Sequence, residues 1–131
     1  MDLIADTSYL VGLWRGQRWA TAYAYAHPEK SIGLPWVVLG EFWHGATRAK
    51  HDSGDVAAFL SIGVHLTDAT HAVPVYAQIC AKLSQVTDYR KISQNDLWIA
   101  SVAVALKKPL LTRNVRHFDL IEDLVLEILE R

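Results

Sequence analysis

The stretch Leu-Ile-Ala-Asp-Thr-Ser, residues 3–8, is an apolar run that ends in a carboxylate. Three consecutive apolar residues followed by three polar ones are typical of a short buried strand that ends where a helix begins. A carboxylate beside buried surface loses hydration, which costs several kcal/mol unless a partner compensates. We therefore expect Asp6 to lie at the end of a core strand and to serve either as the helix N-cap or as a ligand.

The rest of the chain alternates similar short apolar runs with longer helical patterns. Strands that are separated by helices imply right-handed crossovers and a mainly parallel sheet covered on both faces. We predict an α/β fold with a three-layer α/β/α arrangement, in a single domain of residues 1–131. The predicted strands are 3–5, 31–34, 64–67, 110–112 and 125–129; the predicted helices are 8–13, 17–26, 36–50, 54–60, 71–86 and 93–107, with a turn or short helix at 118–124.

The composition is apolar for a small domain. Hydrophobic residues make up 51% of the chain, which has five tryptophans and a mean hydropathy of +0.11. This excess indicates either a partner surface, for a second copy or another protein, or a generous core.

Charge and cysteine content exclude some classes of protein. A net charge of −1 argues against a non-specific basic nucleic-acid binder, but not against a nucleic-acid enzyme with one positive cleft. Cys80 is the only cysteine, which excludes an intramolecular disulfide and a cysteine zinc cluster. The N-terminus lacks the basic region of a signal peptide, and no apolar run reaches the ~20 residues that span a bilayer. We expect a cytoplasmic protein with no membrane segment.

Two further acids interrupt apolar segments. Glu41 lies in the helical pattern 36–50, where its neighbours at helical spacing include Val37 and Val38, so its carboxylate is expected to point toward the core or a cleft. The alternative for Glu41 is a buried ion pair. Asp96 closes Ser-Gln-Asn-Asp, residues 93–96, which has the form of a capping box, so a purely structural role is the alternative there.

A fourth polar residue follows a predicted strand. Asn114 comes two residues after the run 110–112, at the edge where a parallel sheet forms its sites. Asn is also common in turns, so a turn residue is the alternative. His44 lies one turn from Glu41 and is the one histidine expected near the acids, although a helix-surface role is favoured for it.

Taken together, the three acids indicate a shared cation. Mg²⁺ and Mn²⁺ prefer oxygen ligands and are held by one or two carboxylates with water and phosphate, whereas zinc favours nitrogen and sulfur. The chain contains no P-loop, no G-x-G-x-x-G and no G-x-S-x-G motif. The residues themselves therefore predict a metal-dependent phosphoryl-transfer site.

Four segments together resemble one known family. They are Ile-Ala-Asp-Thr-Ser at 4–8; Gly-Glu-Phe at 40–42, followed by Gly45 and Ala46; the run 95–103; and Leu-Thr-Arg-Asn-Val-Arg-His-Phe at 111–118. In this order and at these separations they resemble the PIN-domain family, and within it the VapC-type toxins of type II toxin–antitoxin systems. The resemblance covers essentially the whole chain.

The resemblance implies a PIN fold and a Mg²⁺- or Mn²⁺-dependent endoribonuclease. Position by position, Asp6, Glu41 and Asp96 correspond to the three acids of the family, and Asn114 to a position that is acidic in many relatives. Asp6 and Asp96 would hold the metal, with Glu41 orienting the attacking water. His117 stands where many relatives have Asp, which favours one metal over two.

The remaining implied roles concern substrate and partners. Ser8 and Thr112 would position water or phosphate, and Arg113 and Arg116 would form a positive rim for RNA. The resemblance also implies a cognate antitoxin protein, and a homodimer accords with the apolar composition.

Three other readings remain open from the residues. A response-regulator receiver needs an acidic pair after the first strand, whereas Asp6 has no acidic neighbour in this chain. A haloacid-dehalogenase-type phosphatase needs D-x-D near the start, and Ser8 occupies the position of its second Asp. The third is a PIN-like binding scaffold that has lost its metal.

Overall fold

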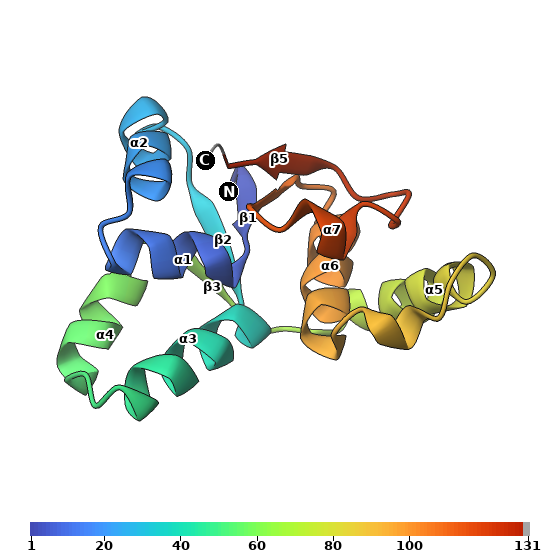
Figure 1. Ribbon diagram of the computed structural model, residues 1–131, viewed down its shortest axis with the longest axis horizontal. Coiled ribbons are helices and arrows are strands. Elements are labelled where there is room, and N and C mark those ends of the chain that lie inside the picture. Colours follow the sequence, from blue (N-terminus) through green and yellow to red (C-terminus); the bar gives the residue numbers. More distant parts are fainter. Residues whose placement is uncertain (130–131) are drawn as a thin grey trace.

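The computed structural model describes residues 1–129. A five-stranded sheet runs through its centre, with helices around it (Figure 1). All four strand pairings are parallel, and the strand order is β3-β2-β1-β4-β5. The prediction of a mainly parallel five-stranded sheet is confirmed. The strands are β1 (Leu3–Ala5), β2 (Ile32–Pro35), β3 (Val64–Leu66), β4 (Leu110–Thr112) and β5 (Leu126–Ile128).

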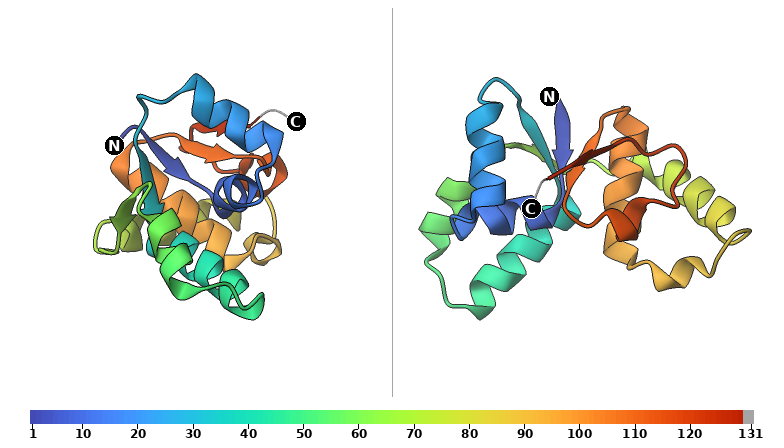
Figure 2. Two further views of the ribbon diagram at one scale, coloured as in Figure 1. Left: turned by 90° about the vertical axis from the view of Figure 1, so that its left-hand side faces the viewer. Right: turned by 45° about the horizontal axis from the view of Figure 1, so that its top comes forward.

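Helices cover both faces of the sheet, which confirms the three-layer α/β/α class. Figures 1 and 2 show α1 and α2 on one side of the strands and α5 and α6 on the other. Within residues 1–129, no helix combines the length and the apolar character that a membrane span requires. The helices are α1 (Thr7–Trp14), α2 (Arg18–Ala26), α3 (Trp36–Arg48), α4 (Ser53–Leu60), α5 (Ala72–Leu83), α6 (Gln94–Leu106) and α7 (Val115–Phe118), with a 3₁₀ turn at Tyr89–Lys91.

Interior strands of the sheet have continuous apolar sequences rather than alternating ones. Every residue of β1 and β4 is buried, because helices cover both of their faces. The edge strand β3 has two exposed residues, Val64 and His65, and follows the alternating pattern only loosely. The apolar runs therefore mark the middle of the sheet, and the site forms beside them.

The strand order creates a switch point between β1 and β4. From β1 the chain adds β2 and β3 on one side, while β4 and β5 lie on the other side. In open parallel sheets, ligands bind in the crevice that forms at the carboxyl ends of the strands at such a point. Asp6 follows β1 there, and its amide N–H donates to the carbonyl of Leu111 over 3.0 Å. This bond places the Asp6 carboxylate beside the end of β4.

The last helix differs from the prediction. A turn or short helix was expected at 118–124, but α7 occupies Val115–Phe118. The chain turns into this helix directly after Asn114, and the buried side chain of Phe118 ends it, with 1% of its surface exposed. The sequence pattern indicated the buried residue at the end of this helix, Phe118, and not the residue at which the helix begins. The other helices begin and end within a few residues of their predicted bounds.

A polar cluster fastens the C-terminal strand to α2. The hydroxyl of Tyr23 donates to the carboxylate of Glu127 on β5. The Lys30 ammonium lies 3.3 Å from Oε1 of the same carboxylate. All three side chains are partly buried, so these contacts are screened less than surface pairs.

We predict that Tyr23→Phe and Glu127→Leu each lower the free energy of unfolding by about 1 kcal/mol, the net value of a hydrogen bond. Because the two residues share one interaction, the double variant should be less destabilised than the sum of the singles. Urea unfolding measures all three, with Asp123→Ala, which breaks the exposed Lys82–Asp123 pair, expected to change stability by less than about 0.5 kcal/mol. Strictly additive losses would contradict a shared cluster.

Candidate active site

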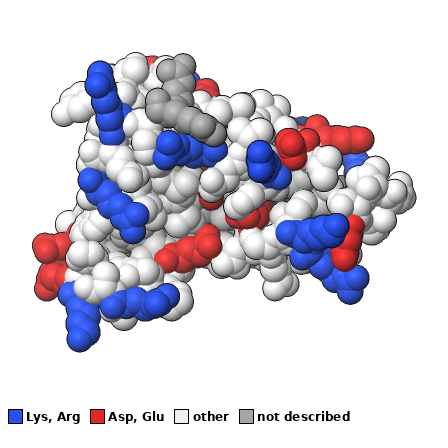
Figure 3. All heavy atoms as spheres, in the orientation of Figure 1, with Lys and Arg blue, Asp and Glu red and all other residues white. Residues whose placement is uncertain are grey.

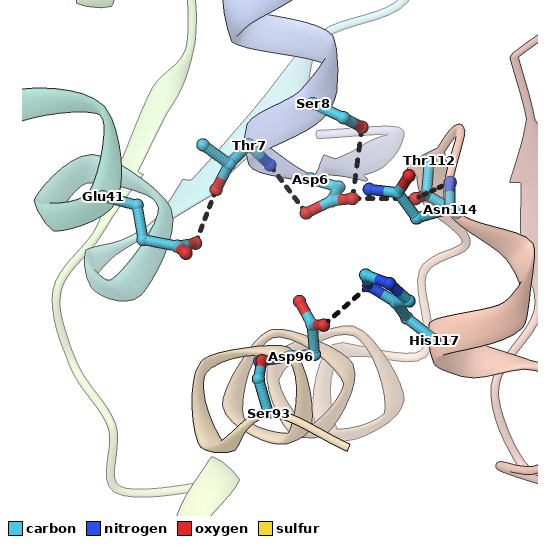
Figure 4. Close-up of polar contacts among 9 residues, drawn as sticks. All are labelled: Asp6, Thr7, Ser8, Glu41, Ser93, Asp96, Thr112, Asn114 and His117. Atoms are coloured by element: carbon cyan, nitrogen blue, oxygen red, sulfur yellow. Dashed lines mark hydrogen bonds and ion pairs between the residues drawn. The ribbon is translucent and has the colours of Figure 1, made fainter. Parts of the chain in front are cut away.

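An open cavity of about 520 Å³ lies at the switch point. Its three acidic side chains come from three separate elements: Asp6 from the end of β1, Glu41 from α3 and Asp96 from the first turn of α6. Figure 4 shows the three carboxylates facing a common space. The other lining residues are Thr7, Ser8, Val11, Gln17, Trp19, Ser93, Arg113, Asn114 and His117.

Asp6 is almost fully buried, with 4% of its surface exposed. Its Oδ1 accepts from the amide of Thr7 over 2.7 Å, so Asp6 does cap α1. Its Oδ2 accepts from the hydroxyls of Thr112 over 2.8 Å and Ser8 over 3.2 Å. The capping role and a place in the cavity therefore coexist.

The environment of Asp6 opposes its negative charge. Burial raises the pKa of the Asp6 carboxyl, and the nearby Asp96 carboxylate raises it further. Hydrogen bonds from Thr112, Thr7 and Ser8 lower the pKa, but the net direction is upward. Hydroxyl and amide donors orient the carboxylate without adding a positive charge.

Glu41 is held by the residue next to Asp6. The Thr7 hydroxyl donates to Oε1 of Glu41 over 2.7 Å, linking α3 to the start of α1 (Figure 4). Glu41 is half-buried and forms no ion pair with a lysine or arginine among residues 1–129. The expectation that its carboxylate points into a cleft holds, and the buried ion pair is absent from the described chain.

Asp96 lies in the capped first turn of α6 while its carboxylate faces the cavity. Its amide donates to the hydroxyl of Ser93 over 3.1 Å, which confirms the cap of α6. Its Oδ2 lies 2.9 Å from Nδ1 of His117. Burial raises the pKa of the Asp96 carboxyl, the His117 contact lowers it and the Glu41 carboxylate raises it, with an upward net direction.

Thr112 and the residues after it close the cavity on the β4 side. Thr112 is fully buried; its hydroxyl donates to Asp6 and accepts from the amide of Asn114 over 3.0 Å. The side chain of Asn114 is exposed and lines the cavity, as does Arg113. Arg116 is exposed but is not part of the cavity wall.

Two contact residues were not anticipated from the sequence as parts of the site. Thr7 was not among the candidate residues, and its hydrogen bond to Glu41 depends on how α3 packs. His117 pairs with Asp96, whereas His44, for which a helix-surface role was favoured, is exposed in a separate hollow next to Glu41. The spacing of Asn114 and His117, one helical turn apart, is the signal that indicates a shared face.

The donor set suits a hard divalent cation. No lysine or arginine of residues 1–129 forms an ion pair with Asp6, Glu41 or Asp96, and Figure 3 shows acidic side chains in the middle of this face with basic ones around them. Among residues 1–129, no group of three Asp, Glu, His or Cys side chains lies close enough to bind one metal ion jointly. Carboxylate oxygens such as those of Asp6, Glu41 and Asp96 are the ligands that Mg²⁺ prefers, and one or two of them with several waters are enough to hold it.

Comparison with known proteins agrees with this geometry. The PIN domain family matches residues 3–124. A protein named Ribonuclease VapC from Rickettsia bellii (strain RML369-C) is 30% identical over 130 residues, which cover 95% of this chain and 93% of that protein.

Solved structures with the same fold belong to toxin–antitoxin complexes. VapBC2 from Rickettsia felis, bound to a DNA fragment from its promoter, superposes with a TM-score of 0.81 at 22% identity, covering 99% of this chain and 100% of that one. VapBC-1 from nontypeable Haemophilus influenzae gives 0.77 at 25% identity, covering 98% of each chain. The first likeness concerns the fold alone.

We predict that Asp6→Asn raises the melting temperature of the metal-free protein at neutral pH. The raised pKa of Asp6 means that the folded state binds its proton more tightly than the unfolded state, whose pKa is about 3.8. The contribution of Asp6 to stability is therefore fully present below that value and is lost as pH rises through the folded pKa. Thermal unfolding in EDTA from acidic to neutral pH should show the gap between variant and wild type opening across this window.

The matched control is Glu122→Gln, which neutralises an exposed acid outside the cavity and should leave the melting temperature nearly unchanged. A lower melting temperature for Asp6→Asn at neutral pH would show that the ionised carboxylate stabilises the fold.

Proposed function

Because the chain belongs to the PIN-domain family, we propose that it is a VapC-type endoribonuclease and the toxin of a type II toxin–antitoxin pair. The observation that carries the proposal is the meeting of Asp6, Glu41 and Asp96 from three elements in one cavity at the switch point. The 30% identity to a protein named Ribonuclease VapC supports RNA as the substrate.

We propose that Asp6 and Asp96 hold Mg²⁺ or Mn²⁺. Burial raises the pKa of both acids, the charge of Asp96 raises the pKa of Asp6 further, and the charge of Glu41 raises the pKa of Asp96. A cation between these carboxylates would offset that repulsion. When bound, such a cation supplies Lewis-acid activation of the attacking water and offsets charge on the phosphate. Asn114 and His117 are not carboxylates, which favours one ion rather than two.

The protein's own groups orient the reactants. We propose that Glu41, whose Oε1 accepts from the Thr7 hydroxyl, orients the attacking water and accepts its proton. Thr112 is fully buried, so we propose that it acts by orienting Asp6 and not by touching RNA. Ser8 and Asn114 face the cavity, where they would position the phosphate or the water. Arg113 on the wall, and Arg116 outside it, would contact the RNA backbone.

We propose a cognate antitoxin as the protein partner. Several of the solved structures that share this fold are VapBC or toxin–antitoxin complexes. A homodimer is the further assembly we propose, because large apolar side chains such as Val64 on β3 and Val73 on α5 are about half exposed. The cytoplasm is the compartment in which such a toxin would meet RNA and antitoxin.

We predict that the protein cleaves single-stranded RNA with Mg²⁺ or Mn²⁺ and that EDTA abolishes the cleavage. Asp6→Asn and Asp96→Asn should each lower the rate by about 100-fold or more, because each removes a ligand charge at the reacting phosphate. Gel analysis of a labelled RNA measures the rate, with Glu122→Gln expected to match wild type. Cleavage that survives EDTA, or an Asp6→Asn variant with full activity, would remove the proposal.

We also predict a loss of activity for Thr112→Val, which keeps the shape of the side chain but removes the donor to Asp6. Groups that orient a metal ligand typically contribute 10–100-fold, so kcat/KM should fall by about that factor. Thr112→Ser keeps the hydroxyl and should restore most of the activity. Equal activity of the Val and Ser variants would show that the hydrogen bond has no part in the reaction.

A further inference from the structure

Two side chains from distant segments meet on the cavity wall. The guanidinium carbon of Arg113, which follows β4, lies 4.3 Å from the ring centroid of Trp19 on α2. Both residues are half-buried and both line the cavity that holds the three acids. A guanidinium over an indole face is attracted by the ring and can stack on it without losing its N–H donors.

Gly12 on α1 fixes the position of the indole. A Cβ at this position would lie 2.5 Å from Cη2 and 2.7 Å from Cζ2 of Trp19. The six-membered ring therefore packs directly against the helix backbone, in a space that only glycine leaves open. Trp19 is thus a fixed support for the arginine above it.

Arg113 is the only lysine or arginine among the described residues that line this cavity. A long cationic side chain beside three carboxylates would be expected to pair with one of them. Within residues 1–129 it pairs with none, and lies instead on Trp19. The stacking keeps its donors free for a different anion.

We propose that Trp19 is a positioning residue that holds Arg113 ready for a backbone phosphate of the RNA and away from the acids. The inference rests on the proposed ribonuclease function and adds a substrate-positioning device to that site. Arg113 acts by contact with the phosphate, whereas Trp19 acts only through Arg113. The planar fork of arginine suits a phosphate, which it binds through two parallel hydrogen bonds.

The test measures RNA binding separately from cleavage. Binding of a short fluorescein-labelled single-stranded RNA is followed by anisotropy in EDTA, and cleavage kinetics are measured with Mn²⁺. Arg113→Gln should weaken binding about tenfold and reduce the slope of log affinity against log salt by about 0.7, the value for one phosphate contact on a single strand. Trp19→Met, which keeps bulk against Gly12 but has no ring, should weaken binding about fivefold and raise KM with kcat nearly unchanged.

The dependence of Trp19 on Arg113 separates positioning from a merely structural role. Trp19→Phe retains an aromatic face and should restore binding to within about twofold of wild type. The double variant Trp19→Met, Arg113→Gln should bind no worse than Arg113→Gln alone, because the tryptophan then has nothing to hold. Lys108→Gln is the charge-matched control: it removes a positive charge just before β4, at the opposite end of the strand from the site, and should change binding by less than about twofold.

The outcomes distinguish the inference from the function on which it rests. If wild type cleaves RNA but Trp19→Met matches it, or if the Trp19 and Arg113 effects add, the positioning role is overturned while the ribonuclease stands. If wild type neither binds nor cleaves RNA, both fall. Should Trp19→Met fail to fold, Arg113→Lys replaces it: the charge remains but the planar stack is lost, and binding should weaken about threefold; unchanged binding overturns the inference.

Discussion

The mutual repulsion of Asp6, Glu41 and Asp96 around one cavity is the constraint on which the site depends. Burial raises the pKa of both Asp6 and Asp96, and each feels the charge of another acid nearby. A folded protein keeps such an arrangement only when the surrounding core holds it in place and a ligand benefits from it. The buried central strands supply the first condition, because they fix Asp6 at their carboxyl ends.

The groups that hold the carboxylates orient them without neutralising them. Thr7, Ser8 and Thr112 donate hydrogen bonds to the carboxylates from one amide and three hydroxyl groups. Among residues 1–129, the only basic side chain that pairs with an acid of the cavity is His117. The one arginine on the described cavity wall lies on Trp19. The described lysines and arginines therefore leave the three carboxylates unneutralised, and the one arginine on the cavity wall stays apart from them.

Local pattern predicted the parts of this site that depend on local structure. Asp6 was visible because an apolar run that ends in an acid marks the end of a buried strand, and Asp96 because Ser93 caps its helix. The contacts of His117 with Asp96 and of Arg113 with Trp19 join elements whose approach is set by tertiary packing, which no local pattern encodes. The start of α7 was predicted too late in the sequence, because the apolar residue that indicates this helix, Phe118, is its last residue.

Calorimetric titration of Mn²⁺ into the protein tests most directly whether a cation relieves this repulsion. We expect saturable binding of a single Mn²⁺ to wild type, and loss of that binding in Asp6→Asn, in which an amide replaces the buried carboxylate. Glu122→Gln, which leaves the cavity intact, should bind as wild type does. Absence of binding heat in wild type, or equal binding by Asp6→Asn, would contradict the claim that these carboxylates are gathered for a metal ion.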